Sequence, residues 1–351
     1  MKAIGYFQSL PIDQKDALID LQLDKPIAKG RDILVKVAAV SVNPVDTKVR
    51  AAMPPENNQP KVIGWDAVGE VVAVGGQTEL FKVGDQVWYA GDLIRSGSNA
   101  EYQLVDERIV GAKPNTLSNV EAAAMPLTAI TAWELLFDRL DFYPQLPSDL
   151  NRYENRVQNN PDDARLLIIG AAGGVGSILT QLAKQLTNAT VIGTASRPQS
   201  ESWVKELGAD HVINHREPLV PQLKALGIND VTHVISLTHT DQHYDQLVEA
   251  LAPQGKLALI DDPQKPIDIM ALKIKSISLH WEFMYTRSMF ATQDIQQQHQ
   301  LLTLLSQLID KGGIKTTLGE HYGTINAENL KRAHAHIESN TAVGKVVLEG
   351  F

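Results

Sequence analysis

Residues 166–176 of this chain read LLIIGAAGGVG, and this stretch decides the fold. Four apolar residues, two of them β-branched, predict a buried strand that ends at Gly170. Apolar residues then recur at helical spacing over 177–186, and a second β-rich run follows at 189–194. A strand, a small-residue turn, a helix and a strand, in this order, form the dinucleotide-binding unit.

Glycines in such a turn let backbone N–H groups approach a pyrophosphate, and the N-terminus of the following helix adds partial positive charge. The same kind of turn also serves strand–helix packing where no nucleotide binds. The order of the elements favours the cofactor, so we expect the turn to contact a dinucleotide. The residues assigned to that contact are Gly170, Ala172, Gly173, Gly174, Val175 and Gly176.

The composition narrows the class of protein. A chain of 351 residues can hold two domains with separate cores, and its net charge of -9 argues against nucleic acid as a partner. No apolar run reaches the ~20 residues of a membrane span, and residues 1–6 show no signal-peptide pattern. We expect a cytoplasmic protein that binds neither nucleic acid nor membrane. The absence of cysteine excludes disulfides, thiolate zinc sites and a cysteine nucleophile.

The two halves of the chain have different patterns. Residues 1 to about 125 are rich in predicted strands, which indicates a twisted, largely antiparallel domain. From Ala164 onward, strands alternate with helices, which predicts a parallel sheet covered on both faces. The predicted strands are 33–40, 68–75, 100–105, 166–169, 191–194, 211–213, 233–237, 256–260, 275–283 and 345–348, and residues 83–89 predict a turn that leads into a strand. The predicted helices include 121–136, which Pro126 interrupts, 200–207, 241–251 and 293–311.

Residues 139–163 are polar and carry Pro144, Pro147 and Pro161. This composition predicts an inserted surface loop with room for a short helix.

Motifs outside the glycine turn resemble a known family. They are NPVD at 43–46, GWDAVG at 64–69, VGDQV at 83–87, PLTA at 126–129 and GKVVL at 344–348. Together they resemble the medium-chain dehydrogenase/reductase superfamily and are most similar to its zinc-free quinone oxidoreductase branch. Three further segments resemble a bacterial subgroup often labelled "zinc-binding alcohol dehydrogenase family protein": 97–102, 237–243 and 280–284. The resemblance covers nearly the whole chain except 139–163.

The resemblance implies an α/β protein: a GroES-like β-rich catalytic domain plus a Rossmann domain with a doubly wound parallel sheet. The catalytic domain would span 1–128 and be completed by 284–351. The Rossmann NADP-binding domain would span 129–283, with the surface insert near 139–163. Family members are commonly dimers or tetramers, and 275–283 matches the strand that pairs across the dimer, so we expect a homodimer.

Zinc alcohol dehydrogenases in this superfamily hold their catalytic metal at three positions, which fall here on Asn43, Trp65 and Leu127. An indole and an aliphatic side chain cannot ligate zinc, and an amide oxygen is a poor ligand for it. We therefore expect no metal. His239 and His243, four residues apart, lack the intervening glutamate of a metalloprotease helix. We expect His334 and His336 to be solvated, because residues two apart on a helix point to different faces.

The second strand of the dinucleotide unit predicts which nicotinamide cofactor binds. NAD enzymes place an acidic residue at the end of this strand, and here that position is Ala195. No carboxylate opposes a 2′-phosphate, and Ser196 and Arg197 are placed to bind one. The alternative is that Arg197 is a surface residue before Pro198. We expect NADPH.

Further cofactor contacts are expected at the ends of later strands, at Leu237, Thr238, Ile260 and Phe283. Residues 283–285 are equally compatible with a cap on the substrate pocket, with core packing and with a dimer interface. The resemblance implies that Lys345 reaches the cofactor pyrophosphate, with a solvated strand-end lysine as the alternative.

The resemblance places Asn43 and Thr128 at the nicotinamide end, where Asn43 can donate to a substrate carbonyl. Tyr89 is an equal candidate for a donor or for core packing. Asp46 and Asp66 are expected to orient their neighbours. Without a metal to stabilise an alkoxide, we expect an NADPH-dependent reductase of quinones or activated enones. The alternatives are a non-catalytic NADPH-binding protein, or a zinc-type alcohol dehydrogenase in name only.

Overall fold

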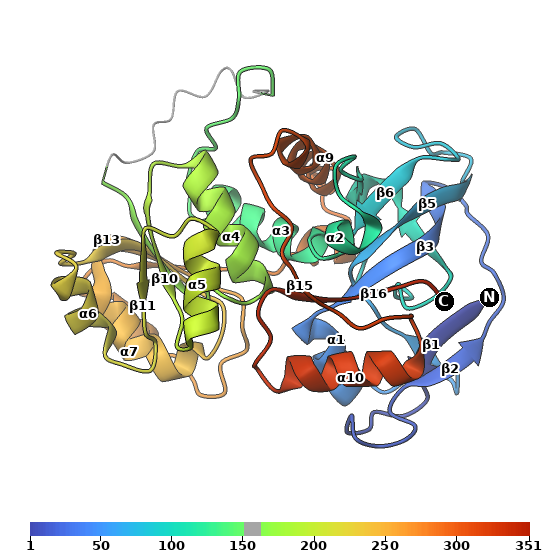
Figure 1. Ribbon diagram of the computed structural model, residues 1–351, viewed down its shortest axis with the longest axis horizontal. Coiled ribbons are helices and arrows are strands. Elements are labelled where there is room, and N and C mark those ends of the chain that lie inside the picture. Colours follow the sequence, from blue (N-terminus) through green and yellow to red (C-terminus); the bar gives the residue numbers. More distant parts are fainter. Residues whose placement is uncertain (151–162) are drawn as a thin grey trace. The chain divides into compact units, whose positions relative to one another are not determined.

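The computed structural model describes residues 1–150 and 163–351 and divides into two compact units. Unit 1 contains Met1–Ile130 and Met284–Phe351, and unit 2 contains Thr131–Phe283. Figure 1 labels many of the helices and strands in each unit. Within the described residues, no helix combines the length and apolarity needed to cross a bilayer.

Unit 1 is built on a seven-stranded sheet in the order β15-β16-β3-β5-β6-β8, with β7 paired to β3. All its pairings are antiparallel except β15 with β16. A smaller sheet has the order β2-β1-β4. The strands are β1 (Lys2–Tyr6), β2 (Ile19–Gln22), β3 (Asp32–Val42), β4 (Lys61–Val62), β5 (Ala67–Val74), β6 (Gln86–Tyr89), β7 (Tyr102–Asp106), β8 (Val110–Ala112), β15 (Leu318–His321) and β16 (Lys345–Glu349).

Short helices flank these sheets. They are α1 (Pro44–Ala52), α2 (Asn119–Ala123), α3 (Pro126–Trp133, which crosses the unit boundary), α8 (Thr286–Met289), α9 (Gln297–Asp310) and α10 (Ala327–Glu338). The predicted helix over 121–136 is present as α2 and α3, separated before Pro126 because proline lacks the N–H that an uninterrupted helix needs.

Unit 2 contains the predicted parallel sheet, in the order β11-β10-β9-β12-β13-β14. Every pairing in it is parallel. The strands are β9 (Arg165–Ile169), β10 (Thr190–Thr194), β11 (His211–Ile213), β12 (Val231–Ser236), β13 (Leu251–Leu259) and β14 (Ser278–Trp281), and the helices are α4 (Gly174–Leu186), α5 (Pro198–Glu206), α6 (Leu219–Ala225) and α7 (Thr240–Ala250).

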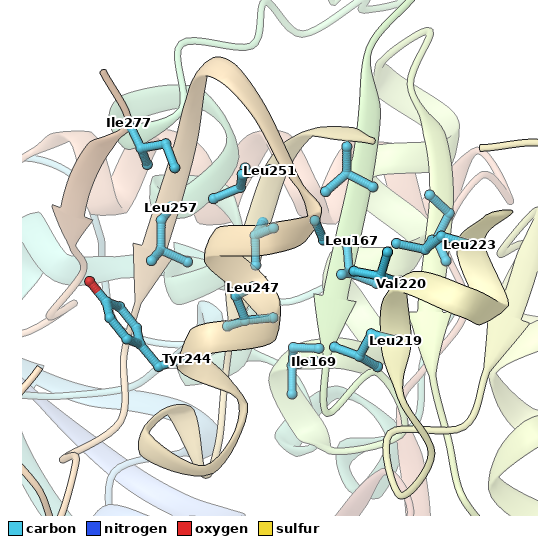
Figure 2. Close-up of a cluster of buried hydrophobic side chains, with 14 of the residues drawn as sticks. Leu167, Ile169, Leu219, Val220, Leu223, Tyr244, Leu247, Leu251, Leu257 and Ile277 are labelled. Atoms are coloured by element: carbon cyan, nitrogen blue, oxygen red, sulfur yellow. The ribbon is translucent and has the colours of Figure 1, made fainter. Parts of the chain in front are cut away.

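Helices cover both faces of this sheet. Helices α4 and α5 contact β9, β10 and β11. On the other face, Figure 2 shows Leu219 and Leu223 of α6 and Leu247 of α7 packed toward Leu167 and Leu257 of the strands. Each enclosed leucine contributes about 1.5–3 kcal/mol of burial free energy. This core fixes the ends of the parallel strands, where the site described below lies.

Two expectations about exposure are wrong. His334 is fully buried, because α10 turns Leu330, Ala333 and His334 toward the unit's interior, and this burial lowers the pKa of His334 to about 3. The predicted surface loop at 139–163 is also wrong at its start, since Leu140 and Phe142 are buried. Residues 151–162 of that loop lie outside the described residues.

Candidate functional site

The glycine turn lies at the point where the strand order of unit 2 reverses. Strand β9 pairs with β10 on one side and β12 on the other. The Gly170 N–H donates to Thr194 Oγ1 at 3.0 Å, and the Leu237 N–H donates to the Ile169 carbonyl at 3.2 Å. The ends of three parallel strands are thus tied together where open α/β sheets bind their ligands.

The turn requires small residues. Gly170 has φ of +81°, and a Cβ on Gly176 would lie 2.4 Å from the Gly170 carbonyl oxygen. Gly173 is the N-cap of α4 and supplies no side-chain acceptor for the first N–H groups of that helix. A Cβ on Gly173 would meet only the Gly170 oxygen, at 3.5 Å. The geometry therefore fits a pyrophosphate above the helix N-terminus.

The residues after β10 also fit a phosphorylated ribose. Ala195 is buried, and its N–H donates to the Ile213 carbonyl of β11 at 3.0 Å. Ser196 and Arg197 follow, both partly exposed. Arg197 precedes α5, and its backbone N–H donates to Ser200 Oγ at 3.3 Å. The guanidinium is thus attached to a fixed backbone beside a position that carries no acid.

The remaining expected cofactor residues lie after other strands of the same sheet. Thr238 follows β12, and its Oγ1 is 2.6 Å from His239 Nδ1. Ile260 follows β13 and is partly buried. Phe283 lies two residues after β14 and is half-exposed. The sheet therefore brings the predicted cofactor residues of unit 2 to its carboxyl edge.

A buried polar network in unit 1 joins Asn43, Asp66 and Lys345. The Asn43 Nδ2 group donates to Asp66 Oδ2 at 2.8 Å, and the Lys345 ammonium donates to the same oxygen at 2.9 Å. Lys345 also donates to Asn43 Oδ1, and the Leu127 N–H donates to Asp66 Oδ1 at 2.7 Å. Three distant segments of the chain thereby hold one carboxylate.

This network fixes the orientation of the Asn43 amide. An ammonium can only donate and a carboxylate can only accept, so Lys345 must face the amide oxygen and Asp66 the amide nitrogen. The second N–H of Asn43 has only long contacts, to the Trp65 carbonyl at 3.4 Å and the Ser41 carbonyl at 3.5 Å. One amide hydrogen therefore remains weakly bonded.

The carboxylates of this network are strongly desolvated. Burial raises the pKa of Asp66, while Lys345 and the Asn43 amide act in the opposite direction. Burial raises the pKa of Asp46 to about 7, although its Oδ2 accepts the Asn43 N–H at 2.6 Å. Asp46 Oδ1 is buried without a hydrogen-bond partner among the described residues. Asp46 is thus partly protonated near neutral pH.

Thr128 and Tyr89 are both buried in unit 1. Thr128 Oγ1 donates to the Met125 carbonyl at 3.0 Å, which leaves its oxygen free to accept. For the Tyr89 hydroxyl, the described part of the chain offers no partner, and burial raises its pKa. Both alternatives for Tyr89, a donor to substrate and a core side chain, are compatible with this position.

The alternative of Lys345 as a solvated strand-end residue is wrong, because the residue is only 3% exposed. All three donors of its ammonium have acceptors in unit 1: Asp66, Asn43 and the Val42 carbonyl at 3.4 Å. Contact with the cofactor pyrophosphate stays a prediction. Sequence reasoning missed the ion pair, although a lysine that opens the apolar strand KVVL is a signal for a buried partner.

The three positions that hold zinc in related enzymes do not fit the metal. Asn43 Oδ1 accepts from Lys345, and the Trp65 indole donates to the Asp92 carbonyl at 3.1 Å. Leu127 is aliphatic and buried. Over residues 1–150 and 163–351, no group of three or more histidine, aspartate or glutamate side chains is arranged to hold a metal. His239 is the N-cap of α7 in a left-handed conformation, outside the helix that contains His243.

Comparisons with known proteins agree with this architecture. The family model of the alcohol dehydrogenase GroES-like domain matches residues 29–115. The family model of the zinc-binding dehydrogenases matches residues 207–348. A Staphylococcus aureus zinc-type alcohol dehydrogenase-like protein is 38% identical over 351 residues, 99% of each chain. A chloroplast envelope quinone oxidoreductase homolog from Arabidopsis thaliana is 27% identical, with 94% of this chain and 93% of that protein covered.

A solved structure agrees with these relatives. A Rhizobium etli protein assigned as a zinc-dependent alcohol dehydrogenase is 53% identical, with a TM-score of 0.92 over 100% of this chain and 98% of that chain. The expected pair of architectures, a GroES-like sheet domain and a Rossmann-like parallel-sheet domain, is therefore confirmed.

Proposed function

The chain belongs to the medium-chain dehydrogenase/reductase superfamily, in its quinone oxidoreductase-like branch, and from that premise we propose that it reduces quinones or activated enones with NADPH, without a metal. The observation that carries the proposal is the network around Asn43. Asn43 stands at one of the three positions that hold zinc in related enzymes. The oxygen of its amide accepts a hydrogen bond from Lys345. A carbonyl acceptor that takes hydride without a Lewis acid suits such a site.

The cofactor preference rests on the residues after β10. Ala195 puts no carboxylate at the expected ribose position, and we assign the 2′-phosphate to Arg197, since a guanidinium can bind phosphate bidentately. The glycine turn of residues 170–176 and the N-terminus of α4 would hold the pyrophosphate. Bound NADPH supplies the hydride.

The chain's own residues would orient the acceptor and stabilise negative charge on it. The weakly bonded N–H of Asn43 is the donor we assign to the substrate carbonyl oxygen. Asp66 and Lys345 hold that amide in one orientation, so the donor is positioned before the substrate binds. We also assign Thr128 and Tyr89 to the end of the site where the nicotinamide would lie. After hydride transfer, the anionic product of a quinone takes one proton from water.

Simple alcohols should be poor substrates. Their oxidation requires removal of the hydroxyl proton by a base or activation by a metal. The names of the Staphylococcus aureus and Rhizobium etli proteins refer to zinc. The metal content therefore distinguishes the proposed metal-free reductase from a zinc-dependent alcohol dehydrogenase. Elemental analysis of active protein should find well under one zinc per chain, and a chelator should leave quinone reduction unchanged. Stoichiometric zinc that is removed together with activity would refute the proposal.

We also assign a homodimer that forms through the edge of the unit 2 sheet. Strand β14 pairs with β13, and Trp281 at the end of β14 and Phe283 two residues later are about half-exposed. Light scattering should give twice the chain mass of 38.5 kDa, and Trp281→Glu should lower it toward the monomer. A monomer at micromolar concentration would contradict this assignment.

A further inference from the structure

Three histidines gather beside the residues assigned to the 2′-phosphate. His215 follows β11, His239 is the N-cap of α7, and His243 lies in the first turn of that helix. The rings of His215 and His243 stand edge to face with their centroids 6.0 Å apart. Two elements that are separate in the sequence therefore bring two imidazoles together in unit 2.

The register of the sheet places this cluster next to Arg197. Thr194 of β10 pairs with Ile213 of β11, so the chain after each strand emerges at the same edge. Arg197 follows the first strand by three residues, and His215 follows the second by two. Arg216 comes directly after His215.

The surroundings of His215 oppose a positive charge on its ring. Burial lowers the pKa of His215, and the positive charges of His243, Arg216, His239 and Arg197 lower it further. Its Nδ1 is buried and, within the described ranges, has no hydrogen-bond partner. An imidazole with an unpaired ring nitrogen and positive side chains nearby can take up a proton once an anion binds beside it.

His243 has a more mixed environment. Burial and His239 lower the pKa of His243, whereas Asp241 and Asp261 raise it. Asp261 is itself held by α7, since it accepts from the Thr240 N–H at 2.9 Å and from Thr240 Oγ1 at 2.5 Å. These two carboxylates are negative groups that act on His243.

We infer that His215 and His243 are part of the site for the adenosine 2′-phosphate, and that binding of this phosphate is coupled to uptake of a proton by the pair. The inference rests on the proposed use of NADPH. The phosphate dianion adds negative charge beside the pair, so a proton from solvent binds an imidazole nitrogen in the complex. Like charges 6.0 Å apart oppose a second proton, so the pair accepts about one.

The consequence is a cofactor preference that depends on pH. Because the complex binds the proton more tightly than the free protein does, lower pH favours the complex. Affinity for a 2′-phosphorylated nucleotide should rise as pH falls from 8.5 to 6.5, whereas affinity for the nucleotide without that phosphate should change little. Below about pH 6 the phosphate itself takes a proton and the trend should end.

Calorimetry with 2′,5′-ADP and 5′-AMP tests this inference without catalysis. Titrations at pH 7 in two buffers of different ionisation enthalpy give the number of protons taken up per nucleotide bound. The wild type should take up about 0.5–1 proton with 2′,5′-ADP and fewer with 5′-AMP, and the Kd for 2′,5′-ADP should fall about tenfold from pH 8.5 to 6.5. The comparison includes His215→Gln, His243→Gln and the double variant.

His211→Gln is the matched control, since His211 lies at the start of β11 and outside the cluster. It should keep the wild-type proton uptake, whereas the double variant should lose it. If 2′,5′-ADP binds more tightly than 5′-AMP but its uptake is absent in the wild type or persists in the double variant, the histidine assignment is overturned and the NADPH preference stands. If the two nucleotides bind equally well at every pH, both proposals fail.

Discussion

The Lys345 ammonium lies 2.9 Å from Asp66 Oδ2, and both side chains are almost completely enclosed. Removing one partner of such a pair leaves a buried charge uncompensated. Lys345→Met should therefore lower the free energy of unfolding by about 3–5 kcal/mol, as measured by urea denaturation.

The control for that variant is Lys205→Met. Lys205 forms an exposed pair with Glu201 at 2.6 Å, and its loss should change stability by less than about 1 kcal/mol. Adding Asp66→Asn to Lys345→Met should cost less than the sum of the two single changes. Strictly additive losses would show that the two groups do not act as a pair.

The second prediction concerns the pH dependence of stability. The pKa of Asp46 is raised from 3.8 to about 7 in the folded chain. Stability from this group is therefore complete below about pH 4 and is lost as the pH rises through 7, because the unfolded chain has then released a proton that the folded chain retains. Asp46→Asn keeps a neutral amide that can accept from the Asn43 N–H.

Urea midpoints of the wild type and Asp46→Asn, measured from pH 4 to 8, check this. As the pH rises from 4 to 8, the free energy of unfolding of the variant should increase by about 2–4 kcal/mol relative to that of the wild type. A constant difference between the two proteins would mean that Asp46 titrates normally.

The third prediction separates cofactor contact from folding in the glycine turn. Gly173→Ala has room in the folded chain, since its Cβ would lie 3.5 Å from the Gly170 oxygen. The added methyl would occupy the surface assigned to the pyrophosphate, so the affinities for NADPH and NADH should fall together, by about tenfold or more. Gly176→Ala should instead destabilise the protein, because its Cβ would lie 2.5 Å from Ala171 Cα.

Fluorescence titrations and thermal melts of both variants test this distinction. Unchanged cofactor affinity in a normally folded Gly173→Ala protein would show that the pyrophosphate does not bind at this turn.

The fourth prediction concerns Arg197. Loss of a charge-assisted contact to phosphate costs about 1.5–3 kcal/mol, so Arg197→Ala should weaken NADPH binding about tenfold to a hundredfold and spare NADH. Ala195→Asp should shift preference in the same direction by placing a carboxylate beside the ribose. Lys205→Ala, in the α5 helix that Arg197 precedes, is the control. Equal losses for NADPH and NADH in Arg197→Ala would show a structural role.

Local sequence patterns predicted unit 2 well. Strand β11 occupies the predicted residues 211–213, and β9 begins one residue before its predicted start. Each strand there is a compact β-rich run followed by a turn. The bounds of helix α6 could not be predicted, because it is short and carries Pro221 in its first turn, which hides a helical pattern.

The polar network of unit 1 could not be found in the same way. Asn43, Asp66 and Lys345 are separated by as many as 302 residues, and only tertiary packing brings them together. The start of α1 does have a local sequence signal: Asn43 is the N-cap, Pro44 is at the first helical position and Asp46 follows two residues later. The burial of His334 had no such local signal.

The most direct test of the proposed reaction is a comparison of kcat/KM for NADPH-driven quinone reduction and NADP⁺-driven alcohol oxidation. A panel of ortho- and para-quinones, enones and primary alcohols is assayed with the wild type and Asn43→Ala. We expect quinones or enones to be preferred, and Asn43→Ala to lower their kcat about tenfold to a thousandfold with little change in NADPH affinity. Faster turnover of alcohols than of quinones, or full quinone reductase activity in Asn43→Ala, would contradict the account.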